Sequence, residues 1–294
     1  MNTETDGVDG PSSAVGMVKL FDVAADGAHR YAGYSDGGSR RVVDGSQLLA
    51  QSIVAASKEL SDHGVRSAHA VFTRVVDDAR PLWFEVDVTH RGRTFAGAIV
   101  TVGQGGRRCA TVSLLLDVVH ADVIRHSAPP PTVGPPADAT GLTMPMVGRQ
   151  LRLVGVADPN DPDEVGPPVL DAWVHYDSVP ERPDLARALI AHFTGHLSLS
   201  ATMRGHVGIG TGQAHKTVSS AVMSIGVAFH EPVAWDGWLL YHHESTQVGA
   251  GMSYVRGQVF TEGGDLIASF VQEAMLRAFE QDPASHPIPA AARL

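Results

Sequence analysis

Alternating apolar and polar residues predict three β-strands near the C-terminus. These strands are expected at residues 237–245, 252–260 and 265–277. Gly249 and Gly251 separate the first two, and Gly263 and Gly264 separate the last two. Strands joined by short glycine-containing turns are typical of an antiparallel meander.

The same pattern of strands occurs earlier in the chain, at an offset of about 157 residues. The earlier segments are 81–89, 94–102 and 107–117. At this offset Phe72 falls on Phe229, and Leu82-Trp83 falls on Leu239-Leu240. A repeat of this length is too long for a solenoid unit and indicates a duplicated domain.

A helix is predicted before the first set of strands, from about residue 45 to residue 60. Its apolar residues recur at steps of three and four, which predicts one buried stripe. This stripe comprises Leu49, Ile53, Ala56 and Leu60. Gln51, Lys58 and Glu59 are expected on the opposite, exposed face. Asp44 and Gln47 are spaced for a capping box at the helix start.

A second helix is predicted over residues 183–199, because Pro183 suits the first helical turn and Asp184 complements the helix dipole there. One stripe of this helix carries Leu185, Leu189, His192, Phe193, His196 and Leu199. Further strands are predicted at 15–23, 65–75, 169–176 and 217–229, and loops at 31–39 and 212–216.

Prolines at 129–131 and 135–136 predict a linker between the two copies, because proline disfavours both helix and sheet. We therefore expect a first domain at 14–126, a Pro/Asp-rich linker at 127–165 and a second domain at 166–280. In each domain a helix followed by strands suggests an α+β unit in which a curved antiparallel sheet wraps the helix.

Composition narrows the class of protein. The 294 residues are 44% hydrophobic and carry a formal charge of −10 without a long basic cluster, which argues against nucleic acid as a partner. No run of 18 apolar residues and no basic leader are present, so we expect a cytoplasmic protein that does not insert into membranes. The single cysteine, Cys109, is expected to be buried and inert.

The ordered set of segments resembles the acyl-CoA thioesterase II family. The residues that carry the resemblance are Gly45-Ser46-Gln47, His69 to Phe72, Pro183 to Leu199, Phe229 to Pro232, Trp238 to Tyr241, Glu244-Ser245, Arg256-Gly257 and Ala268 to Glu273. The family fold implied by this resemblance is a double hotdog, two fused copies of a long helix cradled by an antiparallel sheet.

The resemblance also implies a reaction, the hydrolysis of a fatty acyl-CoA thioester by a water held by an Asp, a Thr and a Gln. Gln272 matches the family Gln, whereas Gly195 stands at the Asp position and Val222 at the Thr position. Two hypotheses follow. The chain is an acyl-CoA thioesterase with a substituted site, or it is a catalytically degenerate acyl-CoA-binding or structural paralogue.

Several side chains are candidates to replace the missing groups. His196 could act as general base, with a hydrogen-bonded core histidine as the alternative. Ser220 and Ser224 are expected on the strand face of Val222, where either hydroxyl could replace the Thr. Gln272 could bind water or satisfy buried backbone groups. Asp44 could bring a carboxylate to the amino end of the first helix.

No cofactor or metal is expected. His192 and His196 have the i, i+4 spacing of two zinc ligands, but no acidic third ligand accompanies them. The expected partner is an acyl-CoA, and a homo-oligomer is expected because exposed sheet edges favour pairing.

Overall fold

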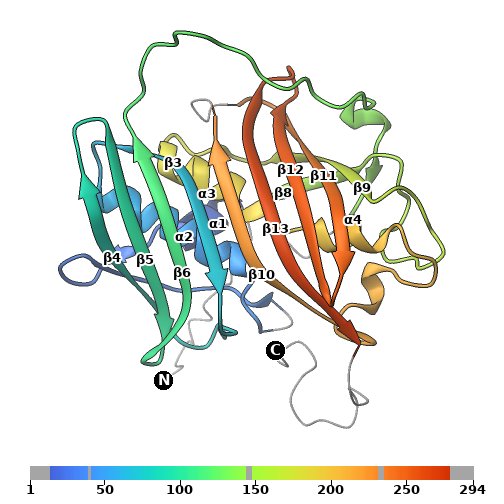
Figure 1. Ribbon diagram of the computed structural model, residues 1–294, viewed down its shortest axis with the longest axis horizontal. Coiled ribbons are helices and arrows are strands. Elements are labelled where there is room, and N and C mark those ends of the chain that lie inside the picture. The colour runs from blue at the N-terminus through green and yellow to red at the C-terminus, as the bar shows by residue number, and fades with distance from the viewer. Residues whose placement is uncertain (1–13, 39–40, 144–147, 231–234, 279–294) are drawn as a thin grey trace, which may run out of the picture.

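The computed structural model describes residues 14–38, 41–143, 148–230 and 235–278. Its strands form one sheet in the order β1-β2-β4-β5-β6-β3-β10-β13-β12-β11-β9-β8-β7 (Figure 1). The strands are β1 Ala24–Ala25, β2 Arg30–Gly33, β3 Gly64–Phe72, β4 Leu82–Arg91, β5 Phe95–Gln104, β6 Arg107–Asp117, β7 Thr140–Gly141, β8 Arg149–Leu153, β9 Val169–Tyr176, β10 Val218–Phe229, β11 Trp238–Gly249, β12 Met252–Thr261 and β13 Leu266–Ala278.

The sheet consists of two modules that meet at its centre. Strands β4, β5 and β6 form an antiparallel meander in the first module, and β11, β12 and β13 form the equivalent meander in the second. Strand β3 of the first module pairs with β10 of the second, with Ala70 opposite Ile225. The predicted duplication is therefore confirmed, and backbone hydrogen bonds make the two copies one continuous sheet.

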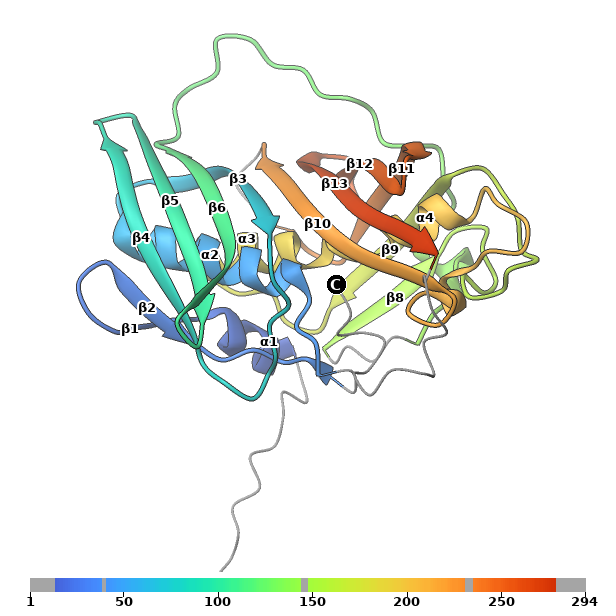
Figure 2. The same cartoon turned by 60° about the horizontal axis from the view of Figure 1, so that its bottom comes forward.

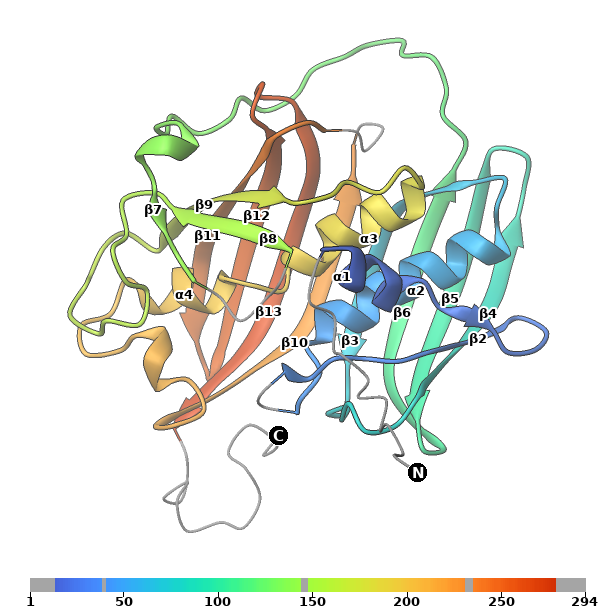
Figure 3. The ribbon, with the colours of Figure 1, turned by 180° about the vertical axis from the view of Figure 1, so that it is seen from behind.

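All the α-helices lie on one face of this sheet (Figure 3). They are α1 Ala14–Phe21, α2 Gly45–Glu59, α3 Pro183–Phe193 and α4 Ser198–Met203. Helix α2 is buried from Ser46 to Ala56, so the prediction of an exposed Gln51 is wrong. The Gln51 amide, 0% exposed, donates to the carbonyls of Leu20 and Tyr34. These bonds compensate the side chain for the loss of water.

The N-terminal segment differs from its prediction. Residues 14–21 form helix α1 instead of the expected strand, because Met17 and Phe21, four residues apart, bury one helical face. A short apolar run fits both the helical and the strand periodicity, and tertiary packing then decides which structure forms. The expected loop at 31–39 begins inside strand β2, which pairs with β4.

The segment expected to be a linker contains secondary structure. Residues 118–135 contain neither helix nor strand and cross one side of the molecule as an exposed connection (Figures 1 and 2). Beyond the short 3-10 helix Pro136–Asp138, strand β8 pairs with β9 and extends the second module's sheet. The expectation of irregular structure is therefore wrong at Arg149–Leu153.

The second long helix is interrupted. Helix α3 ends at Phe193, and α4 begins at Ser198 after Leu197, whose φ of 65° is left-handed. A continuous helix over 183–199 was therefore a wrong prediction. The hydroxyl of Thr194 donates to the Ala191 carbonyl at 2.7 Å, and such local bonds compete with helix continuation.

The amino end of α3 lies against the ends of α1 and α2. Arg182 precedes α3 and forms an ion pair with Asp22 at 2.8 Å. Lys58, in the last turn of α2, binds the other oxygen of Asp22 at 2.7 Å. This cluster, Arg182-Asp22-Lys58, links the ends of the three helices through ion pairs.

None of the helices among the described residues is both long enough and apolar enough to cross a membrane. Within the motif at 229–232, residues 231 and 232 lie outside the described residues.

Candidate active site

A cavity of about 510 Å³ lies between the two modules, and we call it the helix cavity. Its walls come from the start of α2, the break between α3 and α4, and strand β10. The lining residues include Asp44, Gly45, Ser46, Gly195, His196, Leu197, Ser220, Val222 and Ile225. The structure thus brings together Gly195, His196, Ser220 and Val222, which the sequence analysis singled out separately.

Helix α2 directs its amino end and one carboxylate to this cavity. Asp44 has an extended backbone, with φ −65° and ψ 135°, and its side chain does not cap the helix. The predicted capping box is therefore wrong, and the Gln47 amide instead accepts from the backbone N–H of Asp36 at 3.0 Å. The first amides of a helix carry partial positive charge, which favours an anion beside them.

Two hydroxyl groups at the cavity wall lack an internal partner. Ser46 and Ser220 are each 1% exposed, and neither hydroxyl has a hydrogen-bond partner within the part of the chain that the structure describes. Buried polar groups are rarely left unsatisfied, so an orphan pair at a cavity indicates a bound water or ligand group. The sequence analysis missed Ser46, although it lies in the motif that opens α2.

A partly buried cation lies near this site. The Arg149 guanidinium, on β8, lies over the Phe193 ring with 4.8 Å between Cζ and the ring centroid. Burial lowers its pKa, and attraction to the hydroxyls of Tyr176 and Tyr241 and to the Asp44 carboxylate opposes that effect. Arg149 lay within the expected linker, so no sequence pattern indicated its position.

His192 and His196 pack edge to face, with ring centroids 5.1 Å apart. His196 lines the helix cavity, whereas His192 is buried behind it. Burial, followed by repulsion from Arg149, holds the pKa of His192 well below its ordinary value, so this imidazole is neutral. No cluster of three or more metal-ligating side chains occurs among the described residues.

The sequence matches models of known protein families. A family model described as the acyl-CoA thioesterase C-terminal domain matches residues 125–276, and the acyl-CoA thioesterase N-terminal domain matches 36–116. The chain belongs to the acyl-CoA thioesterase family. Human acyl-coenzyme A thioesterase 8 is 24% identical over an alignment of 263 residues that covers 81% of each chain. Acyl-CoA thioesterase 2 of Haemophilus influenzae is 26% identical over 259 residues, covering 82% of this chain and 89% of that one.

Solved structures of similar proteins confirm the double hotdog fold. The acyl-CoA thioesterase II TesB2 of Mycobacterium marinum superposes with a TM-score of 0.76 at 23% identity, covering 90% of this chain and 99% of that chain. A hot dog fold protein from Alicyclobacillus acidocaldarius gives a TM-score of 0.73 at 19% identity, covering 90% and 98%.

In this acyl-CoA thioesterase family member, the residue at the Asp position of the resemblance has no room for a side chain. A Cβ built on Gly195 would lie 2.5 Å from both Cβ and Oγ of Ser46. Real Cβ atoms do not approach so closely, and the contact is with the first turn of a buried helix. The packing of α2 against the helix break therefore requires glycine at this position.

A β-bulge changes the expected faces of β10. Val222 pairs with Ala274 and Ser224 with Glu273, so Met223 is an additional residue between them. The alternation shifts at the bulge. The prediction that Ser224 shares the face of Val222 is therefore wrong, and its hydroxyl donates to the Glu273 carboxylate at 2.7 Å. Ser220, on the other side of the bulge, lines the helix cavity.

Gln272 forms a hydrogen bond to the backbone at the break between α3 and α4. It is 1% exposed, and its side-chain amide donates to the Thr194 carbonyl at 3.3 Å. This bond corresponds to the reading in which the amide satisfies a buried backbone group. Because Thr194 precedes Gly195, Gln272 fixes one wall of the cavity without lining it.

Proposed function

We propose that the protein hydrolyses fatty acyl-CoA thioesters to the free acid and CoA, and that the reaction takes place in the helix cavity. Membership of the acyl-CoA thioesterase family supports the substrate and the reaction. The observation that carries the proposal is the presence of a carboxylate, Asp44, beside the orphan hydroxyls of Ser46 and Ser220 in one cavity.

The proposed roles follow from the chemistry of these groups. The two hydroxyls hold a water, and the Asp44 carboxylate takes its proton as the water oxygen bonds to the thioester carbonyl carbon. The oxyanion that forms is stabilised by the amides at the amino end of α2. When the carbon–sulfur bond breaks, the proton passes to the CoA sulfur. His196 is the alternative base, and Gln272 is a positioning residue.

Release of free thiol from acyl-CoAs of several chain lengths tests this proposal. We expect Asp44→Asn to lower kcat by about 10²- to 10⁴-fold, the usual contribution of a positioned general base. His196→Gln should change kcat less than tenfold. Asp138→Asn removes one carboxylate from an exposed position outside the cavity and serves as the charge-matched control.

The other outcomes separate the competing hypotheses. A large loss of activity in His196→Gln with a nearly active Asp44→Asn would assign the base to histidine. If the wild-type protein binds acyl-CoA saturably but releases no thiol, the degenerate, non-catalytic reading replaces this proposal.

We further propose that the protein is cytoplasmic and forms a homo-oligomer. The oligomer is supported by an exposed apolar strip on the sheet face opposite the helices, where Val71, Ile99 and Leu115 are 43%, 37% and 44% exposed. Burial of such side chains between copies would remove them from water. Light scattering after size exclusion should give a mass above that of one 31.0 kDa chain.

A further inference from the structure

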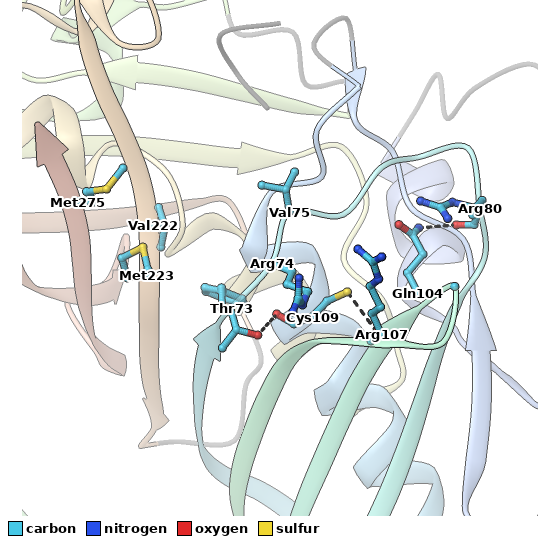
Figure 4. A pocket seen from close by; sticks show the side chains of 12 residues that line it. Thr73, Arg74, Val75, Arg80, Gln104, Arg107, Cys109, Val222, Met223 and Met275 are labelled. Atoms are coloured by element: carbon cyan, nitrogen blue, oxygen red, sulfur yellow. Dashed lines mark hydrogen bonds between the residues drawn. The ribbon is translucent and has the colours of Figure 1, made fainter. Parts of the chain in front are cut away.

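A second cavity, of about 650 Å³, adjoins the helix cavity (Figure 4). We call it the arginine groove. One wall comes from the segment after β3 and from the β5–β6 hairpin, and the other comes from β10 and β13. The opposing side chains are Arg74, Arg80 and Arg107 on the first wall and Val222, Met223 and Met275 on the second.

The positive charge of this groove contrasts with the chain as a whole, whose formal charge is −10. Arg80 is partly neutralised by Asp77, with 2.6 Å between Nη2 and the carboxylate. Arg74 and Arg107 make no ion pair and no side-chain hydrogen bond within the described residues. Burial raises the pKa of the Cys109 thiol in the same wall, so this group adds no negative charge.

The groove and the helix cavity share one wall. Phe72, Arg74, Val75 and Val222 line both of them. A thioester that reacts in the helix cavity can therefore direct its thiol part along this shared wall toward the groove. Beyond its pantetheine arm, coenzyme A carries a diphosphate and a ribose phosphate, and guanidinium groups bind phosphate through paired, charge-assisted hydrogen bonds.

We propose that the arginine groove binds the phosphate groups of coenzyme A, with Arg74 and Arg107 as the main contacts. This inference rests on the proposed function, because it takes the thioester site to be the helix cavity. The apolar wall of Val222, Met223 and Met275 borders the path of the pantetheine arm. The groove thereby distinguishes a CoA thioester from a thioester that lacks the nucleotide.

Calorimetric titration with CoA and with pantetheine, which carries the same thiol arm without phosphates, tests the site. In the double variant Arg74→Gln/Arg107→Gln we expect the Kd for CoA to rise on the order of 10- to 100-fold, from the loss of two charge-assisted contacts. The Kd for pantetheine should stay unchanged. Arg108→Gln is the matched control, because this neighbour does not line the groove.

A kinetic measurement complements the titration. The single variant Arg107→Gln, at a residue that lines the groove but not the helix cavity, should raise KM for an acyl-CoA at nearly constant kcat. It should hydrolyse the corresponding acyl-pantetheine like the wild type. The proposal is overturned if CoA and pantetheine bind the wild type equally, or if Arg108→Gln weakens CoA binding as much as the double variant. Arginine-dependent CoA binding by a protein that releases no thiol would keep this site and reject the hydrolytic function.

Discussion

At the scale of single residues, Gly195 and Ser46 form a steric pair that decides what the helix cavity can contain. We expect Gly195→Ala to destabilise the fold by about 1–3 kcal/mol, because the added methyl overpacks the start of α2. Ser46→Gly should relieve this clash in the double variant. Urea unfolding of both single variants and the double variant gives the coupling free energy. Additive effects would mean that the two residues do not compete for the same space.

The buried histidines predict a pH dependence of stability. Burial lowers the pKa of His243 to about 4, against an ordinary value of 6.5. The folded state thus favours the neutral ring. The contribution of His243 to the free energy of unfolding is therefore fully present above pH 6.5, and it is lost as the pH decreases toward 4. The slope is at most about 1.4 kcal/mol per pH unit for each such group. His192, shifted in the same direction, adds to the effect.

Urea unfolding between pH 7.5 and 4 measures this dependence. His243→Gln should reduce the loss of stability on acidification, because one proton-linked group is removed. His120→Gln, at an exposed position in the connection from residue 118 to residue 135, is the control and should leave the profile unchanged. An identical profile for both variants would show that His243 does not contribute.

At the scale of secondary structure elements, the meander strands could be predicted from the sequence, whereas β2, β8 and several local details could not. The meander strands are long and bounded by glycine turns, so their alternation was sufficient. The bulge at Met223 leaves no mark in the alternation, because it depends on the pairing of β10 with β13. The prediction for Ser224 failed for this reason.

The helices show the same limit. The ends of helix α2 were predicted to within one residue. The exposure of Gln51 was predicted wrongly, because a helix enclosed by a sheet and two other helices has no exposed stripe. The break after Phe193 follows from packing against Ser46 and from the Gln272–Thr194 hydrogen bond. Neither contact is local in sequence, so the residue pattern continued through the break. The roles assigned to His196 and Gln272 stay predictions.

The β11–β12 turn carries a strained residue. Ala250 and Gly251 form a two-residue hairpin loop with φ values of 54° and 77°, and Gly249 pairs with Met252. A left-handed alanine costs about 1–2 kcal/mol, whereas asparagine adopts this conformation readily. We expect Ala250→Asn to stabilise the protein by roughly 0.5–1 kcal/mol. Thermal unfolding of the variant should show a higher midpoint than the wild type. An unchanged midpoint would mean that the backbone of Ala250 is not strained.

At the scale of the whole molecule, the exposed connection from residue 118 to residue 135 joins two modules that already pair through β3 and β10. We expect cleavage at a protease site inserted at 121–126 to leave the two fragments associated, because the connection adds no strand to the sheet. Size exclusion under native conditions checks this, with the uncut protein as control. Separation of the fragments would mean that the connection, not the central pairing, holds the modules together.

The duplicated architecture creates two equivalent corners, one at the amino end of each central helix. The corner at α2 contains the helix cavity, and the corner at α3 carries the partly exposed ion pairs of Arg182, Asp22 and Lys58. Because the cavity lies at the α2 corner, titration with a non-hydrolysable acyl-CoA analogue should saturate at one equivalent per polypeptide.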